Sequence, residues 1–176
     1  RHNRSRAPNT SGALSIPQLR ESVRGRVIAP GDAGYDAART PFYGGIDRRP
    51  AAIVRVADDQ DVARVIALAR ETGLDLAVRS GGHSALGHSV SEGGLVVDLG
   101  DMRGLEIDVP GRTAWAQTGL TAGEYTSAVG AHGLATGFGD TGSVGIGGLT
   151  LGGGIGFLVR KHGLTIDSLL AADVVT

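Results

Sequence analysis

Two dense glycine clusters constrain the fold of this chain more than any other feature of its sequence. Glycine accounts for 30 of the 176 residues, about 17% compared with about 7% in an ordinary domain. One cluster lies in RSGGHS at 79–84, and ten of the twenty residues from 137 to 156 are glycine. No Gly-X-Y repeat is present, so a collagen helix is excluded.

Consecutive glycines let the backbone adopt positive φ and turn several N–H groups toward one anion. Without side chains in the way, a pyrophosphate can approach such a main chain closely. The first cluster also directly follows a predicted strand, which is where α/β proteins bind nucleotides. We therefore expect the clusters to bind a phosphate-bearing ligand. Tight turns without a ligand are the alternative.

The remaining composition is that of a globular protein, with 41% hydrophobic and 20% charged residues and a net charge of −1. Near-neutral charge and 4% aromatic content argue against nucleic-acid and anionic-membrane partners. The absence of cysteine excludes disulfides and iron–sulfur clusters, and no histidine pair has metalloprotease spacing, so no metal is expected. No apolar run reaches the ~18 residues of a membrane span. We expect a soluble protein, with the cytoplasm slightly favoured.

The clearest local pattern is a strand–helix–strand unit. Residues 52–56 form a β-branched run, Asp58 or Asp59 can cap a helix, Gly73 can end it, and residues 76–79 form a second strand. Strands joined by a helical crossover are parallel. This unit predicts a parallel sheet.

A third strand is expected at 95–99. The pattern changes after residue 101, where we expect an antiparallel hairpin at 105–117, a helix at 121–132 ending near Gly133, a short helix at 157–162 and a last strand at 171–175. We expect an α+β fold with a solvated leader over 1–24, a first lobe over 25–101 and a second lobe over 102–176. Because the last predicted strand stops at the final residue, we expect a fragment of a longer protein.

Other nucleotide-binding folds fit poorly. Gly137, Gly139 and Gly142 form a G-x-G-x-x-G motif, but a dinucleotide fingerprint needs a helix that begins inside it. Since glycines continue to Gly156, no helix is expected there. The single lysine, Lys161, follows no glycine loop at the spacing of a P-loop. No G-x-S-x-G hydrolase motif is present.

With these motifs, residues 25–176 resemble the FAD-binding (PCMH-type) domain of FAD-linked oxidases. The resemblance rests on RSGGHS at 79–84 and on TGSVGIGGLTLGGGIGFLVRKHGLTIDSLLAADVV at 141–175. It points to the berberine-bridge-enzyme-like group of the vanillyl-alcohol-oxidase superfamily. It implies FAD bonded covalently to His83, with Ser80 to Gly82 holding the pyrophosphate and 141–148 running along the flavin. Thr141 stands where some members have a second, cysteinyl link, so a single link is expected.

The cofactor site implied by the resemblance is larger than these few residues. It comprises Arg79, Ser80, Gly81, Gly82, His83, Ser84, Gly87 and His88 in the first cluster, Asp140, Thr141, Gly142, Ser143, Gly145, Ile146, Gly147 and Gly148 in the second, and Val174 near the end of the chain.

The resemblance also implies a reaction, the oxidation of an alcohol, amine or sugar by hydride transfer to the flavin, with molecular oxygen as acceptor. The family's substrate domain and base lie in a C-terminal part that this chain lacks, so no catalytic residue is assigned. Two other readings stay open: a truncated FAD-binding module without turnover, and a nicotinamide dehydrogenase. The sequence does not indicate the substrate or the oligomeric state.

Overall fold

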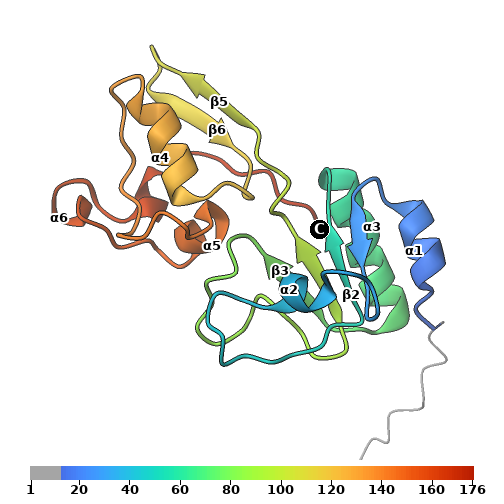
Figure 1. Ribbon diagram of the computed structural model, residues 1–176. Helices are drawn as coiled ribbons and strands as arrows, with labels where there is room; N and C mark the ends of the chain where they lie inside the picture. The colour runs from blue at the N-terminus through green and yellow to red at the C-terminus, as the bar shows by residue number, and fades with distance from the viewer. Residues whose placement is uncertain (1–12) are drawn as a thin grey trace, which may run out of the picture.

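The computed structural model describes residues 13–176, which contain two separate β-sheets with helices around them (Figure 1). The larger sheet contains β1 (Arg26–Ile28), β2 (Ala52–Arg55), β3 (Leu76–Arg79) and β4 (Leu95–Asp98) in the order β1-β2-β4-β3. β1 is antiparallel to β2, while β2 and β3 are both parallel to β4. The smaller sheet is the antiparallel hairpin of β5 (Leu105–Asp108) and β6 (Thr113–Ala116). The α+β class is confirmed.

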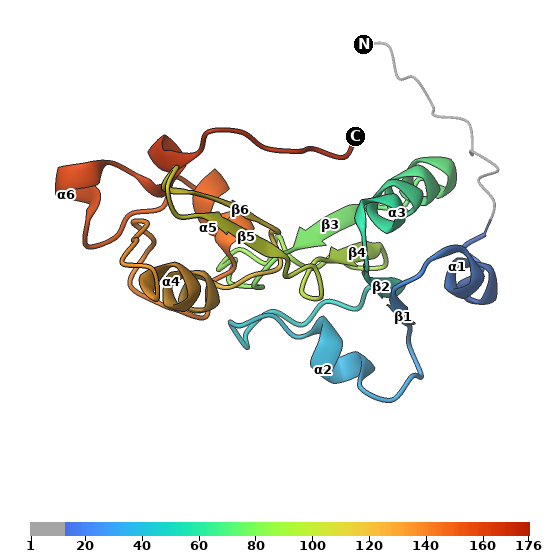
Figure 2. The ribbon, with the colours of Figure 1, turned by 90° about the horizontal axis from the view of Figure 1, so that it is seen from above.

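The strand–helix–strand prediction is correct in its elements. α3 (Asp59–Thr72) begins after Asp58, whose carboxylate accepts the N–H of Asp61, and it ends at Gly73 with φ +69°. The two strands are parallel, but β4 lies between them. Because β2, β3 and β4 are parallel, their carboxyl ends lie at the same edge of the sheet. β3 points toward the β5–β6 hairpin (Figure 2), and the first glycine cluster directly follows it.

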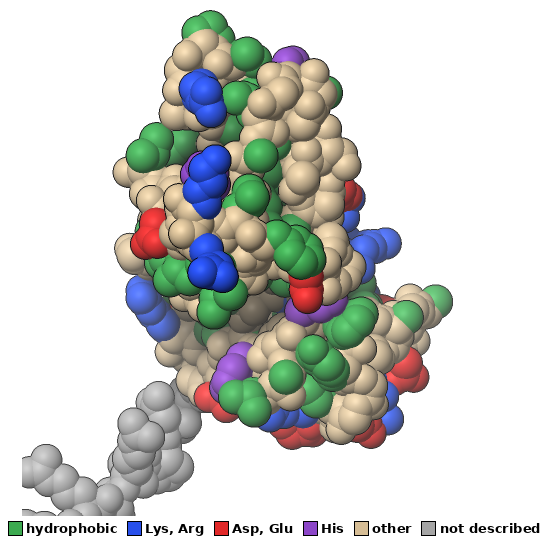
Figure 3. Space-filling view, turned by 90° about the vertical axis from the view of Figure 1, so that its left-hand side faces the viewer, with side chains coloured by type: hydrophobic (Ala, Val, Ile, Leu, Met, Phe, Trp, Pro, Cys, Tyr) green, Lys and Arg blue, Asp and Glu red, His purple; other side chains and the backbone are tan. Residues whose placement is uncertain are grey.

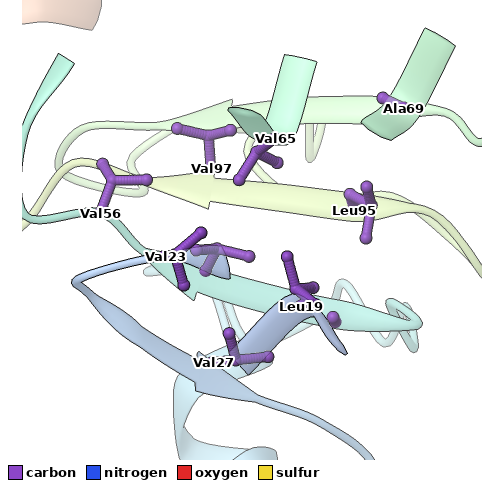
Figure 4. Close-up of a cluster of buried hydrophobic side chains, with 10 residues drawn as sticks. Leu19, Val23, Val27, Val56, Val65, Ala69, Leu95 and Val97 are labelled. Carbon is purple, nitrogen blue, oxygen red and sulfur yellow. The ribbon is translucent and has the colours of Figure 1, made fainter. Parts of the chain in front are cut away.

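Helices cover both faces of the larger sheet. α1 (Ile16–Ser22) and α3 pack on one face around Leu19, Val54, Val65 and Leu95 (Figure 4). α2 (Tyr35–Arg39) packs on the opposite face through Tyr35 and Ala38. The N-cap of α2 is Gly34. The nearby Asp32 carboxylate does not cap the helix; it accepts the Ala29 N–H and a guanidinium N–H of Arg20.

The expected solvated leader is wrong for residues 16–23. Pro17 lies in the first turn of α1, where its missing N–H costs nothing. The helix places Leu19 and the following Val23 in the core, 3% and 8% exposed. The rest of the leader, up to residue 12, lies outside the described residues.

Asp61 joins the chain after α1 to the start of α3. Its buried carboxylate accepts the backbone N–H groups of Arg24, Gly25 and Ala57 and a guanidinium N–H of Arg64. Burial alone would raise the pKa of Asp61, but these hydrogen bonds outweigh it and hold the pKa below its usual value.

We expect Asp61→Ala to lower the free energy of unfolding by roughly 3 kcal/mol at pH 7, because three backbone N–H groups lose their buried acceptor. The lowered pKa means that this contribution is complete above about pH 5 and declines as the pH falls below about 4. Urea unfolding of the full-length gene product at several pH values measures it. Asp59→Ala is the control, since Asp59 is exposed; equal losses in the two variants contradict the assignment.

The second lobe is built on the hairpin and α4 (Ala122–Gly130), with the hairpin confirmed as predicted. Thr121 and Glu124 form a reciprocal capping box at the start of α4. The chain then continues through α5 (Ile146–Leu151), α6 (Val159–His162) and the 3₁₀ helix η1 (Thr165–Ser168). The lobe's small core contains Leu120, Ala122, Phe138 and Ile146.

Two predictions for this lobe are wrong. α5 begins inside the glycine-rich segment, where no helix was expected, because Gly145 starts it in an extended conformation and Ile146 is anchored in the core. The element directly before this helix is α4 and not a strand, so the dinucleotide fingerprint still lacks its context. Residues 171–175 form no strand, because their backbone makes no ladder of hydrogen bonds with any of the described strands.

Candidate functional site

The two glycine clusters meet at the junction of the lobes, where Gly81 and Gly145 lie backbone against backbone. A Cβ atom on Gly81 would fall well under 3.0 Å from the Gly145 backbone, and one on Gly145 would overlap both the Gly81 nitrogen and the Ser80 Oγ. The Ser80 hydroxyl donates to the Thr118 carbonyl at 2.5 Å, and Gly147 faces the Thr118 side chain. The first cluster is thus fastened directly to the second lobe.

The backbone N–H groups of residues 81–84 are free at this junction. None of them has an acceptor within the part of the protein that the structure describes. Gly82 adopts φ +72°, and its carbonyl accepts the Phe42 N–H at 3.0 Å. A left-handed residue within a run of free N–H groups is one feature of an anion nest. The segment overlaps the predicted pyrophosphate contact, Ser80 to Gly82, and its free N–H groups are compatible with that role.

His83 lies within this segment and is half-buried. Its imidazole stacks on the Phe42 ring, with centroids 4.0 Å apart and planes 18° from parallel. His88 is exposed, and its N–H bonds the Ser84 hydroxyl at 3.1 Å. Gly87 is buried with φ +73° and turns the chain between them. Figure 3 shows a hollow between the two lobes, with histidine side chains at its rim.

Arg79 directly precedes the segment with the free N–H groups. Its side chain is buried, 7% exposed. The guanidinium donates to the carbonyls of Ser89, Ala38 and Arg39, which joins the loop after β3 to the end of α2. Burial lowers the pKa of Arg79. The structure therefore gives this side chain a positioning role.

We expect Arg79→Met to lower the free energy of unfolding by roughly 3 kcal/mol, because three carbonyls at the junction lose their donor. The matched control is Arg70→Met, since Arg70 is exposed on α3, and its expected effect is within about 0.5 kcal/mol. Urea unfolding of the two full-length variants compares them. Equal stability would show that the Arg79 bonds contribute nothing.

The second cluster is held by the segment at the start of α4. The N–H groups of Ala122 and Gly123 donate to the carbonyls of Val144 and Gly142, both at 2.8 Å, and Ile146 N–H donates to the Leu120 carbonyl at 3.0 Å. This pairing leaves the predicted site residues Asp140, Thr141, Gly142, Ser143 and Gly148 exposed, Gly147 half-buried and Gly145 and Ile146 buried.

Val174 differs from the other predicted site residues. It is 76% exposed and lies in an extended segment that runs back from the second lobe toward β3 and α3 (Figure 2). The last residues of that segment, Val175 and Thr176, border a hollow against Ile66 and Leu76.

The sequence analysis did not predict two residues of the junction. The carbonyl oxygen of Thr118 accepts the Ser80 hydroxyl, and no sequence pattern indicates a contact of a backbone carbonyl. Phe42 had a signal, because Phe42 and Tyr43 are adjacent aromatic residues in a loop of a chain with only 4% aromatic content. Among residues 13–176, no group of three or more acidic, histidine or cysteine side chains is arranged to hold a metal. No helix in that range has the length and apolarity needed to cross a bilayer.

A family model described as FAD binding domain matches residues 50–176. Among curated proteins, the chain is 39% identical over 155 residues to (R)-6-hydroxynicotine oxidase of Paenarthrobacter nicotinovorans, covering 88% of this chain and 34% of that protein. It is 37% identical over 139 residues to berberine bridge enzyme-like 14 of Arabidopsis thaliana, covering 76% and 26%.

The chain also superimposes on solved structures of such proteins. The chain superimposes on 6-hydroxy-D-nicotine oxidase from Arthrobacter nicotinovorans with a TM-score of 0.83 and 39% identity, over 88% of this chain and 34% of the other. A berberine-bridge-enzyme-like protein of Physcomitrella patens gives a TM-score of 0.82 at 29% identity over the same shares. The chain spans about a third of the length of these relatives.

Proposed function

The chain belongs to the FAD binding domain family, in its PCMH-type form with berberine-bridge-enzyme-like relatives, and on this premise we propose that its full-length protein is an oxidase carrying FAD at the junction of the two lobes. In this proposal His83 bonds the flavin covalently, and the substrate is a small alcohol, amine or sugar. The observation that carries the proposal is the run of free N–H groups at 81–84, which includes His83 and begins against the second glycine cluster.

The junction fits FAD in its chemistry. The free N–H groups at 81–84 supply donors for the pyrophosphate without a positively charged side chain. The absence of Cβ atoms at Gly145 and Gly147 lets the second cluster lie close to the first, and in this proposal the flavin ring lies along the backbone of 141–148. FAD bound there supplies the oxidising chemistry, the acceptance of a hydride from a substrate carbon. The chain's own residues bind and orient that cofactor.

Bond formation between His83 and FAD needs an oxidant to balance. An imidazole nitrogen joins the 8α carbon of the flavin, and the imidazole N–H and one methyl C–H lose their hydrogens. The two electrons released pass through the flavin to molecular oxygen, which becomes hydrogen peroxide. With no cysteine in the chain, this histidyl link is the one protein–flavin bond proposed.

Relatives named as oxidases, including a chitooligosaccharide oxidase, support an oxidase acting on a small molecule with oxygen as acceptor. Turnover requires a base and a substrate pocket, and we propose that sequence outside this chain supplies both. The second candidate function is an FAD-binding module without turnover.

The proposal is tested by the visible spectrum of the purified full-length protein before and after anaerobic addition of alcohols, amines and sugars. We expect flavin absorbance that one substrate class bleaches, with recovery and hydrogen peroxide formation on admission of air. Flavin absorbance that no class bleaches favours the non-catalytic module. A colourless protein that cannot be reconstituted with FAD contradicts both.

A further inference from the structure

Phe42 is an aromatic residue that the fold does not need for its core. Its side chain is 61% exposed, so it gains little from burial. It is nonetheless fixed in position, because its N–H bonds the Gly82 carbonyl at 3.0 Å and its ring meets the Tyr43 ring edge-on at 5.3 Å. Because the ring is exposed and yet fixed in position, its role is expected to lie in its contacts and not in core packing.

The contact that stands out is the stack on His83. Centroids 4.0 Å apart at 18° leave one face of the imidazole covered by the phenyl ring. Both nitrogens of an imidazole lie in the ring plane, so a stack fixes the plane in which they can react while leaving the ring edge open. The other face of the ring is not used by this contact.

The segment that carries Phe42 is tied to the His83 loop at several points. Two carbonyls at the end of α2, those of Ala38 and Arg39, accept from the Arg79 guanidinium. The Phe42 N–H then bonds Gly82, the residue before His83. The phenyl ring and the imidazole therefore belong to one hydrogen-bonded unit, and the stack does not depend on a flexible loop.

We propose that Phe42 is a positioning residue for the flavin bond of His83: its ring holds the imidazole plane in the orientation from which a nitrogen reaches the flavin's 8α carbon. This inference rests on the covalent link of the proposed function. The interaction free energy of the stack is that of an aromatic pair, up to about 1.4 kcal/mol. Its loss is therefore expected to slow bond formation by up to about tenfold. FAD binding itself depends on the N–H groups of 81–84 and is retained.

The test uses the full-length protein, prepared without flavin and then incubated with FAD in air. The covalent fraction is followed with time by acid precipitation, which separates bonded from free flavin. Phe42→Leu is expected to bond FAD several-fold to tenfold more slowly than wild type, with an unchanged total of bound FAD. Phe42→Trp restores a flat ring and is expected to recover the rate. Tyr43→Leu is the comparison variant, because the Tyr43 ring contacts the ring of Phe42 and not that of His83, and we expect it to slow bond formation less than Phe42→Leu does.

Three results overturn the inference. The first is a Phe42→Leu variant that bonds FAD at the wild-type rate. The second is a loss of total bound FAD in Phe42→Leu that Tyr43→Leu shares, which would mean that the aromatic pair only stabilises the fold. The third is a wild type that binds FAD without bonding it, which removes the covalent part of the proposed function and this inference with it.

Discussion

Replacing Gly145 by alanine is expected to remove most of the bound FAD from the full-length protein. Gly145 has φ −68° and ψ 132°, which alanine adopts without strain, so the effect is purely steric. The new Cβ atom would overlap the Gly81 nitrogen and the Ser80 Oγ. Because one of these is backbone, the two clusters must separate. We expect a cost of about 3 kcal/mol, the upper end of the range for overpacking.

Two further variants make this experiment specific. Gly130→Ala is the matched control, because nothing lies within 4 Å of its Cβ position and it ends α4; it is expected to bind FAD normally and to be stabilised by up to about 1 kcal/mol. Ser80→Ala combined with Gly145→Ala relieves one clash and leaves the Gly81 clash, so only partial recovery is expected. FAD content and urea unfolding measure both effects. Normal FAD content in Gly145→Ala contradicts the junction as the binding site.

His83→Ala is expected to abolish covalent flavin while leaving FAD bound to the native protein. The substitution removes the nucleophilic nitrogen but none of the backbone N–H groups at 81–84. Acid precipitation should therefore release all of the flavin from the variant and none from wild type. His88→Ala is the control, since His88 lies in the same loop with an exposed side chain.

A His83→Ala protein that still holds flavin in the acid pellet would place the link on another residue. If His88→Ala released the flavin instead, the link would belong to the exposed histidine. A variant that loses all FAD, covalent and non-covalent, would show that His83 holds the cofactor rather than bonding it.

The larger sheet was predictable because its signals are local. β-branched runs, the Asp58 cap and the left-handed Gly73 each specify a short piece of chain. The insertion of β4 between β2 and β3 was not predictable, since strand order depends on partners far apart in sequence. α1 was not predicted, because Pro17 disfavours a helix at most positions but lies here in the first turn, where its missing N–H costs nothing.

The candidate site was located from the sequence, but its construction was not. The glycine clusters marked the two backbone segments, yet only the structure shows that Gly81 and Gly145 are in contact. The sequence grouped Arg79 with cofactor-binding residues, whereas the structure places its guanidinium among carbonyls on the α2 face. Such assignments depend on the direction of a side chain, which a motif does not contain.

The most direct test of the account is the intact mass of the denatured full-length wild-type protein, followed by mapping of the modified peptide. The account predicts the polypeptide mass plus one FAD less two hydrogens, with the added mass on the peptide that contains His83. The mass of the bare polypeptide, from a protein that is also colourless in its native state, would contradict it.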